Sequence, residues 1–316
     1  MTTSETAKLA ATIVITSKDR CADLRKALLS CVTQAGGPEI IVVDDASTDD
    51  TALIVREEFP GVNLITHAKP MGYIMGRNEA ALVATGDVIF SIDDDAIFTT
   101  PNVVQQTLAQ FDDARIGAAA IPFADVNKSP RIHQKAPGGD DCWVADRYIG
   151  TAHAVRRDVF LKLGGYRECY FHQGEERDFC LRMLNSGFVV RLGISDPIHH
   201  FESPKRDTTR MDLYGRRNDV LYVWLNIPAT HLAIALPATT LRGLWFGVKV
   251  GRPFRMLRGV FMGYVAVFNY WAQRAPVRSQ TGRLFRTLQR MGPIRLEEVE
   301  SRLFHEAGRG MPRDEV

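Results

Sequence analysis

The chain has 316 residues, of which 45% are hydrophobic and 24% are charged, as in an ordinary globular protein of one large domain or two modest ones. This composition excludes collagen, coiled coil, low-complexity disorder and a disulfide-stapled mini-protein. The net charge of +2 predicts no nucleic-acid partner.

The N-terminal segment 1–10 is polar and lacks the apolar core of a signal peptide, so we expect it to be disordered. The five cysteines are odd in number and form no CxxC pair. This pattern favours a reducing, cytoplasmic compartment and argues against a structural zinc site.

Short runs rich in β-branched residues alternate with helical patterns through the first hundred residues. Strands are predicted at 11–16, 39–43, 62–66 and 87–92. The alternation predicts an α/β fold with a mostly parallel, doubly wound sheet and helices on both faces. In such sheets, ligands bind outside the carboxyl ends of the strands.

The rest of the sequence is less regular, and residues between Ile121 and about 155 show no clear pattern. A glycine-rich turn then leads to a predicted helix over 175–186 and a strand over 188–192, and the pattern is helical from about Met211. We therefore expect an α/β catalytic domain at 11–205, a helical region at 206–296 and a polar tail at 297–316.

Two acidic clusters follow predicted strands. Asp44 and Asp45 come after the second strand, and the run Asp93–Asp95 comes after the fourth. Three like charges at the end of a buried strand repel one another unless a cation or a solvated turn offsets them. Hard carboxylate oxygens suit Mg²⁺ or Mn²⁺, which could bridge them to a diphosphate, whereas the alternative is a solvated turn that caps the next helix.

Three further groups are candidates for chemistry. Glycines around Arg77 lead into a helix that could meet a phosphate group. Acids at the start of the 175–186 helix either cap it or include a general base. These acids are Glu175, Glu176 and Asp178. His199 and His200 end a strand, and because neighbouring side chains point to opposite faces, we expect only one of them to contact a metal ion or phosphate.

Four blocks in this order resemble the family-2 glycosyltransferases of GT-A fold. ATIVITSKDR resembles that family's opening strand and turn, and EIIVVDDASTDDT resembles its nucleotide-binding signature. GRNEAALVATGDVIFSIDDD is similar to its Arg-Asn helix and Asp-x-Asp strand, and GGYRECYFHQGEERDFCLRMLNSG to its acceptor-side block. The resemblance covers residues 11–203. It implies metal-dependent, inverting transfer of a sugar from a nucleoside diphosphate to a hydroxyl of a glycan or lipid-linked acceptor, in polysaccharide or glycolipid synthesis.

The resemblance also implies roles for single residues. The implied donor-binding set is Ser17, Asp44, Asp45, Arg77, Asp93 and Asp94. In this set Ser17 would lie near the base, Asp93 near the ribose and Arg77 near the pyrophosphate. The implied ligands of Mg²⁺ or Mn²⁺ are Asp93, Asp95 and one of His199 and His200.

Glu176 would be the base that takes the proton of the acceptor hydroxyl during a single displacement. The family commonly has Asp at this position, so Glu175 and Asp178 stay as alternative bases. The chain also departs from the family at Thr16, where Pro is usual, and at Lys18, where an aromatic residue is usual. These departures alter the predicted pocket for the nucleoside base.

Two other functions are alternatives to glycosyl transfer. A nucleotidyltransferase that makes a nucleotide sugar normally has a glycine-rich loop after its first strand, and TSKDRCADL contains no glycine. A non-catalytic nucleotide-sugar binding module would be indicated by loss of the metal aspartates or of the acidic pair, and both are present.

Charge is unevenly distributed along the chain. Residues 1–241 hold 25 Lys/Arg and 31 Asp/Glu, a net charge of −6, whereas Arg242–Arg290 hold ten Lys/Arg and no acid. The charge-free run Val220–Leu241 has 22 residues, about the length that spans a bilayer, but Pro228 and Pro237 disfavour spanning. The aromatic and basic residues that follow favour peripheral attachment to an anionic membrane on its cytoplasmic face, with a buried helical cap as the alternative.

Overall fold

The computed structural model describes residues 9–138, 141–202 and 207–303. Most of the segment expected to be disordered (1–8), most of the predicted polar tail (304–316) and the predicted boundary at 205 lie outside these residues.

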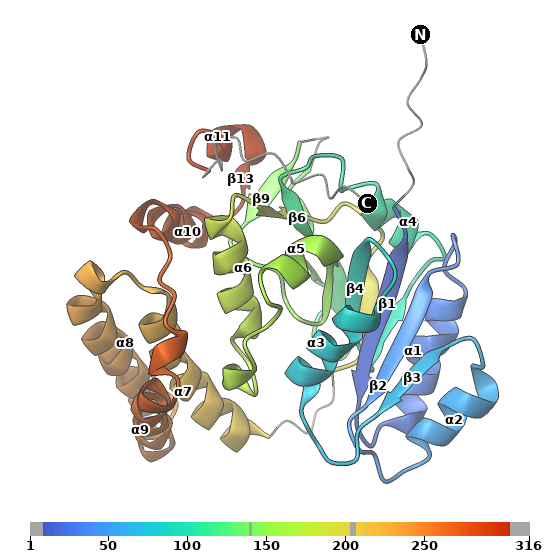
Figure 1. Cartoon of the computed structure of the whole chain (residues 1–316), viewed down its shortest axis with the longest axis horizontal. Helices are drawn as coiled ribbons and strands as arrows, with labels where there is room; N and C mark the ends of the chain where they lie inside the picture. The colour runs from blue at the N-terminus through green and yellow to red at the C-terminus, as the bar shows by residue number, and fades with distance from the viewer. Residues whose placement is uncertain (1–8, 139–140, 203–206, 304–316) are drawn as a thin grey trace, which may run out of the picture.

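A nine-stranded sheet forms the centre of the molecule, in the order β13-β9-β11-β6-β10-β4-β1-β2-β3 (Figure 1). Its strands are β1 (Ala11–Ser17), β2 (Glu39–Asp44), β3 (Asn63–Thr66), β4 (Val88–Asp93), β6 (Ile116–Ala120), β9 (Trp143–Ala145), β10 (Ala152–Arg156), β11 (Val189–Leu192) and β13 (Ile294–Arg295). The four predicted strands, β1 to β4, pair in parallel. The predicted α/β fold is therefore present in this half of the sheet.

The other half of the sheet is mixed. β10 lies between β4 and β6 and is antiparallel to both, and β9 is antiparallel to β11 and β13. β10 and β9 come from the part of the sequence without a clear pattern. β9 has only three residues, and His153 lies among the apolar residues of β10, so neither shows a clear pattern and pairing with neighbouring strands defines them.

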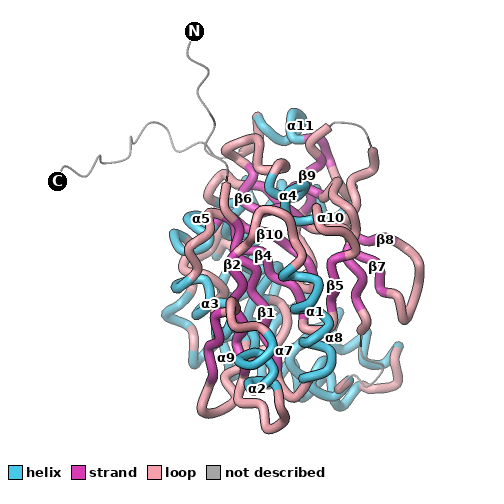
Figure 2. The backbone as a smooth tube through the Cα atoms, turned by 90° about the vertical axis from the view of Figure 1, so that its right-hand side faces the viewer, coloured by secondary structure: helices cyan, strands magenta, loops and turns pink. Residues whose placement is uncertain are grey.

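A second sheet of four short strands lies beside the main one, in the order β5-β12-β7-β8. Its strands are β5 (Ala96–Phe98), β7 (Phe123–Asp125), β8 (Ile132–His133) and β12 (Ile198–His200). Figure 2 shows β5, β7 and β8 on the same side of the main sheet as α1, with α3 and α5 on the other side. This small sheet brings residues after β4 next to residues after β11.

Helices cover both faces of the main sheet. They are α1 (Cys21–Val32), α2 (Thr51–Glu58), α3 (Tyr73–Val83), α4 (Val103–Leu108), α5 (Arg157–Lys162) and α6 (Glu175–Asn185), with a 3-10 turn at Glu168–Tyr170. In α1, Leu24, Ala27, Leu28 and Cys31 are buried at helical spacing and pack into the core. Because both faces are covered, β1 and β4 are almost continuously apolar, as expected for buried parallel strands.

Three long helices form a layer to the left of the sheet in Figure 1: α7 (Thr208–Asn226), α8 (Ala229–Lys249) and α9 (Pro253–Asn269). Glycines let them approach closely: a Cβ at Gly259 would lie 2.8 Å from the carbonyl oxygen of Leu213, and one at Gly247 would lie 2.8 Å from Cγ of Met256. The apolar run predicted from Val220 is divided between α7 and α8. Among the described helices, none combines the length and apolar character that crossing a membrane requires.

After this layer the chain returns to the sheet. A 3-10 turn (Trp271–Gln273) leads to α10 (Ser279–Met291), which packs against α6, and then to β13 and α11 (Leu296–Glu300). β13 pairs with β9 and so forms the outermost strand. The helical layer is therefore anchored to the sheet domain at both of its ends.

Candidate active site

Strand pairing brings the two acidic clusters to one edge of the sheet. β1 lies between β2 and β4, so that Ser17 is level with Asp44 and Thr16 is level with Asp93. The clusters therefore flank the carboxyl end of β1, which is where doubly wound sheets bind ligands.

Asp93, Asp95 and His200 form a cluster whose potential ligand atoms lie within 4.8 Å of one another. After Asp95 the chain enters β5, which pairs with β12 so that His200 lies opposite Ala96. This pairing places the imidazole beside two carboxylates that are far from it in the sequence.

One oxygen of each carboxylate is held by an arginine. Nη2 of Arg77 donates to Oδ1 of Asp93 at 2.9 Å, and Nη2 of Arg20 donates to Oδ2 of Asp95 at 2.8 Å. Nε2 of His200 lies 3.9 Å from Oδ2 of Asp93 and 3.2 Å from Oδ1 of Asp95. The arginines thus fix the carboxylates with their other oxygens directed toward the imidazole.

The electrostatics of this cluster suit a cation. Burial alone would raise the pKa of Asp95, but contacts with His200 and Arg20 lower it to about 2. Burial alone would lower the pKa of His200, but the facing carboxylates raise it. On the other side of the ring, Oδ2 of Asp125 lies 3.8 Å from Nδ1 of His200, and a carboxylate behind a metal-binding histidine commonly orients it. The carboxylate oxygens of this cluster suit Mg²⁺ or Mn²⁺.

Asp94 and Ser17, which were both predicted to bind the donor, bind each other. Oγ of Ser17 donates to Oδ2 of Asp94 at 2.8 Å, and Nη1 of Arg20 lies 2.9 Å from Oδ1. Burial raises the pKa of Asp94 to about 7, although Arg20 and Ser17 oppose this shift. Both oxygens of Asp94 therefore bind protein groups, and these contacts stabilise the turn after β4.

Asp45, a second predicted donor-binding residue, holds the loop before α3. The backbone amides of Met71 and Gly72 donate to its two oxygens at 2.6 and 2.9 Å, and Nδ1 of His67 lies 2.8 Å from Oδ1. Burial would raise the pKa of Asp45, but these contacts lower it. Asp44 uses Oδ1 to accept from one backbone amide of the following loop at 2.9 Å. Asp44 thus makes fewer contacts than Asp45 at this edge of the sheet.

The structure encloses Arg77 in protein, and it brings one histidine of the predicted pair to the cluster. Arg77 is only 5% exposed, and its Nη2 also donates to the carbonyl oxygen of Gly150 at 3.2 Å. Since the guanidinium is enclosed by protein, it positions Asp93, and this geometry does not favour the predicted direct contact with a pyrophosphate. His199 is exposed on the opposite face of β12, so His200 is the member of the pair that joins the cluster.

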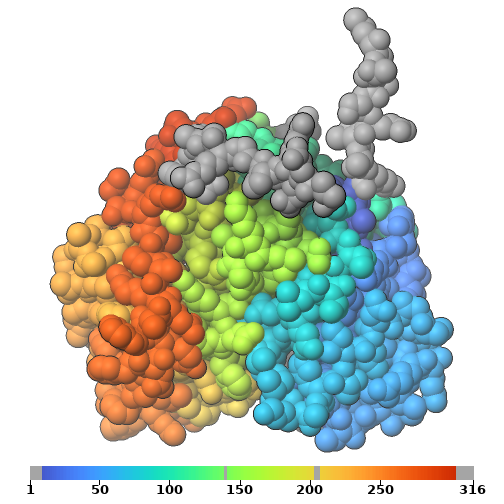
Figure 3. Space-filling view, in the orientation of Figure 1, coloured from blue at the N-terminus to red at the C-terminus, as the bar shows by residue number. Residues whose placement is uncertain are grey.

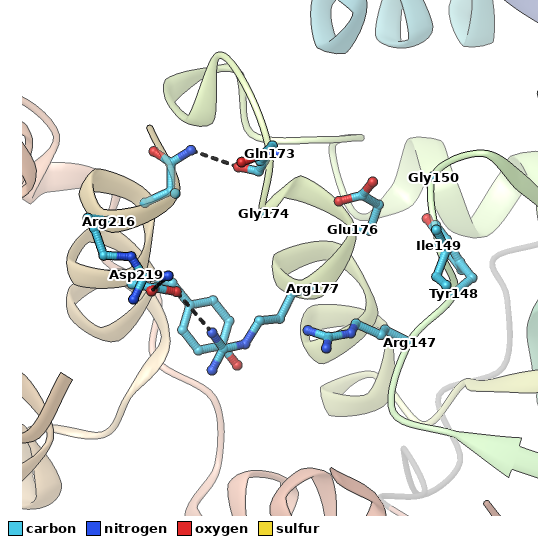
Figure 4. Close-up of a pocket in the computed structure, with 13 residues that line it drawn as sticks. Arg147, Tyr148, Ile149, Gly150, Gln173, Gly174, Glu176, Arg177, Arg216 and Asp219 are labelled. Carbon is cyan, nitrogen blue, oxygen red and sulfur yellow. Dashed lines mark hydrogen bonds and ion pairs between the residues drawn. The ribbon is translucent and has the colours of Figure 1, made fainter. Parts of the chain in front are cut away.

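A cavity of about 370 Å³ lies between the start of α6, the loop before β10 and α7 (Figure 4). Its lining includes Arg147, Gly150, Gln173, Glu176, Arg177 and Asp219. In Figure 4, Glu176 lies on α6 beside the loop that carries Gly150, and Arg216 and Asp219 project from α7 on the other side. A second cavity, of about 290 Å³, shares Gln173 and Arg216 and extends toward α8 and α9.

Asp178 is not at the cavity. Oδ1 accepts hydrogen bonds from Arg167, Tyr170 and Asn226, and Oδ2 accepts one from Arg182. The residue is fully buried. These contacts join α6 to α7 and leave no route for an acceptor hydroxyl, so the geometry does not favour Asp178 as the base.

Glu175 and Glu176 are neighbours in very different surroundings. Glu175 is fully buried and makes no well-formed hydrogen bond through its carboxylate, whose Oε1 lies 4.0 Å from Nη1 of Arg77. Burial, with a further contribution from the charge of Glu176, raises the pKa of Glu175 well above its usual range. Glu176 instead lines the cavity. Of the three candidate bases, Glu176 is the one whose carboxylate lines the cavity.

Gly150 connects the cavity with the acidic cluster. Its carbonyl accepts from the same Nη2 of Arg77 that donates to Asp93. A Cβ at Gly150 would overlap Oε1 of Glu176 and lie 3.3 Å from Nη1 of Arg77. The backbone at Gly150 therefore lies between the cavity and the cluster, and the absence of a Cβ there permits the observed orientation of the Glu176 side chain.

Several residues at this site were not predicted from the sequence. Arg20 could have been predicted, because it lies in the turn after the first strand, and an arginine there can form an ion pair with the acidic run after the fourth strand. Asp125 and Arg147 lie in the part of the sequence without a clear pattern, and His67 stands alone at the end of a strand. For these three, only the folded structure reveals the neighbours.

A family model described as glycosyl transferase family 2 matches residues 12–164. These residues form a glycosyltransferase family 2 domain. The chain is thus a glycosyltransferase, as the resemblance implied.

Two relatives and one solved structure define the similarity further. YwdF, an uncharacterized glycosyltransferase of Bacillus subtilis (strain 168), is 26% identical over 219 residues, which are 66% of this chain and 80% of YwdF. The undecaprenyl-phosphate 4-deoxy-4-formamido-L-arabinose transferase of Klebsiella pneumoniae is 24% identical over 264 residues, which are 78% of each protein. The mannosyltransferase PcManGT of Pyrobaculum calidifontis, solved with GDP-Man and Mn²⁺, has a TM-score of 0.57 and 18% identity, with coverage of 90% of this glycosyltransferase and 81% of PcManGT. The GT-A fold predicted from the sequence is confirmed by this structural similarity.

Proposed function

We propose that this glycosyltransferase moves a sugar from a nucleoside diphosphate to an acceptor hydroxyl with inversion at the anomeric carbon. Asp93, Asp95 and His200 would hold a divalent cation, and Glu176 would be the base. The observation that supports the proposal most directly is the arrangement of two carboxylates, each held by an arginine through one oxygen, around one imidazole. The presence of Mn²⁺ and GDP-Man in PcManGT also supports it.

Glu176 would accept the proton of the acceptor hydroxyl as the hydroxyl oxygen forms a bond to the anomeric carbon. The bond from that carbon to the diphosphate oxygen breaks in the same step, so one displacement inverts the configuration. A bound divalent cation would offset the negative charge that develops on the departing diphosphate. Arg20 and Arg77 hold the carboxylates in place before the donor arrives, which reduces reorganisation during the reaction.

The acceptor would be a glycan or a lipid-linked glycan that enters the cavity beside Glu176. Arg147 and Arg177 line this cavity and suit an acceptor that carries negative charge. The name of the Klebsiella relative, a transferase for undecaprenyl-phosphate, supports a lipid-linked acceptor. Residues 11–205 would act as the catalytic domain, and residues 206–296 would contribute α7 to the acceptor side.

Thermal-shift measurements with UDP, dTDP and GDP, each with and without Mn²⁺, test the donor site. Binding to the native state at 100-fold excess over the dissociation constant adds about 2.7 kcal/mol to stability. We expect one nucleotide to raise Tm only with Mn²⁺, and Asp95→Ala to lose this shift. Equal shifts in wild type and Asp95→Ala would contradict the assigned metal site.

Product analysis then tests the reaction. We expect release of the nucleoside diphosphate and an NMR spectrum that shows inverted anomeric configuration in the product. Release of pyrophosphate from a nucleoside triphosphate and a sugar phosphate would instead identify a nucleotidyltransferase. Tight nucleotide-sugar binding without turnover of any acceptor would identify a binding module.

A further inference from the structure

The outer surface of the helical layer is unusually apolar for a surface in contact with water. On α8, Ile234, Leu241, Trp245 and Val248 are more than half exposed, and Trp245 is 71% exposed. Their spacing of seven, four and three residues places them on one side of the helix. The opposite side of α8 carries Gly247, which packs against α9. The exposed apolar stripe is thus a continuous face.

α9 carries a matching face. Phe254, Leu257, Phe261 and Phe268 are spaced by three, four and seven residues, and Phe254 and Phe268 are 84% and 80% exposed. The two helices pack against each other, and in Figure 3 their residues form the left flank of the molecule. We call these two stripes together the α8–α9 face. Exposed apolar surface of this kind is typical of an interaction site.

The charge of the helical layer indicates which kind of partner binds the α8–α9 face. Between Asp219 and Glu297 the sequence contains eleven Lys/Arg and no acidic residue. Arg242, Lys249 and Arg258 are exposed and form no ion pair with any of the described residues. Aromatic side chains with unpaired cations among them are typical of segments that lie in the interface of an anionic bilayer, where long basic side chains reach the headgroups.

We propose that the α8–α9 face docks this protein onto an anionic phospholipid surface, with the aromatic side chains at the level of the headgroups. A second copy of the chain fits the face poorly, because pairing two such faces would bring their cations together with no acid to offset them. The docking does not depend on the proposed function, since it is a property of the helical layer alone. Where both hold, the cavity that extends toward α8 and α9 lies next to the lipid surface.

Vesicle co-sedimentation of the full chain tests the docking. We expect it to bind vesicles of mixed phosphatidylcholine and phosphatidylglycerol, and to bind pure phosphatidylcholine at least about tenfold more weakly because each basic residue near an anionic surface adds about 1 kcal/mol. High salt should weaken the binding to mixed vesicles, since it screens the headgroup charge. Equal binding to both vesicle types, or none to either, would overturn the proposal.

Two sets of variants locate the binding. The variant W245A/F254A/F268A should reduce binding to mixed vesicles by at least about tenfold. The matched control L29A/L82A removes two exposed apolar side chains on α1 and α3 and should bind like wild type. Because all five side chains are exposed, the variants should fold, and thermal unfolding checks this. Equal binding by the wild type and the aromatic variant would contradict the assignment of the face.

Light scattering provides an independent outcome. We expect the wild type and W245A/F254A/F268A to have the same molar mass without lipid. A wild-type dimer that becomes monomeric in this variant would show that the face is an interface between copies, and would overturn lipid docking. Quenching of tryptophan fluorescence by brominated lipid should be smaller after Trp245→Phe. This decrease would locate the Trp245 side chain at the bilayer surface.

Discussion

The acidic residues at the two sides of the site are held in opposite ways. At the end of β4, Asp93 and Asp95 each have one oxygen bound by a buried or half-buried arginine. At the start of α6, Glu176 faces a cavity and Glu175 is enclosed without a well-formed hydrogen bond. A cation site needs carboxylates fixed in advance, whereas a base needs a lone pair that is free to take a proton. The roles of neighbouring acids therefore follow from their contacts rather than from their order in the sequence.

The largest expected effect is that of Glu176→Gln, which removes the free carboxylate on the cavity side. A general base contributes about 10²–10⁴-fold to rate, so we expect kcat to fall by that factor while metal-dependent donor binding stays unchanged. Steady-state kinetics and nucleotide titration measure the two quantities. Glu175→Gln, one residue away, is the matched control. A larger loss of rate in this control than in Glu176→Gln would reverse the assignment of the two glutamates.

Arg20→Gln tests whether arginine contacts position the aspartates at the end of β4. Arg20 contacts both Asp94 and Asp95, and loss of a residue that orients metal ligands commonly lowers metal affinity by about 10–100-fold. Isothermal titration calorimetry with Mn²⁺ measures this affinity. Arg25→Gln removes an exposed arginine paired with Glu58 and should leave it unchanged. Unaltered Mn²⁺ affinity in Arg20→Gln would show that the arginine does not position the carboxylates.

Gly150→Ala perturbs the segment between the two sides. The added Cβ would overlap the carboxylate of Glu176 and push it away from its place, and small displacements of a reacting group have large effects on rate. We expect kcat to fall by about tenfold with little change in Tm or in donor affinity. Gly61→Ala, where the new Cβ meets open space, should behave as wild type. A loss of donor affinity without a loss of kcat would contradict a positioning role.

The smallest effect on activity is expected for Glu175→Gln, because burial raises the pKa of Glu175 and so favours its neutral form, which glutamine resembles. Its folded pKa is above the unfolded value, so its contribution to stability is complete below that unfolded value and is lost as pH rises through the folded pKa. Glu175→Gln should therefore gain Tm over wild type as pH increases. Thermal unfolding across pH, with exposed Glu57→Gln as control, measures the difference. A Tm difference that does not vary with pH would contradict the raised pKa.

The sequence predicted the parallel half of the sheet well, because β1, β2 and β4 are apolar runs of six or seven residues. It also placed both acidic clusters at the strand ends. The antiparallel β10 could not be predicted, since His153 and Arg156 interrupt its apolar residues and its pairing with β4 and β6 defines it. For the same reason the sequence could not separate His199 from His200 or Asp178 from Glu176. That choice depends on which side of β12 faces the acidic cluster and which side of α6 faces the cavity.

The close approach of the helices in the layer has a consequence for the acceptor. At Gly259 the absence of a Cβ lets the backbone of α9 lie directly against the carbonyl oxygen of Leu213 on α7, so the two helices are closely packed. With the α8–α9 face resting on lipid, the height of Glu176 above the bilayer would be a fixed dimension of the protein. An acceptor hydroxyl carried by a short glycan would then be reached or missed according to the number of sugars beneath it, so the enzyme would select its acceptor by length.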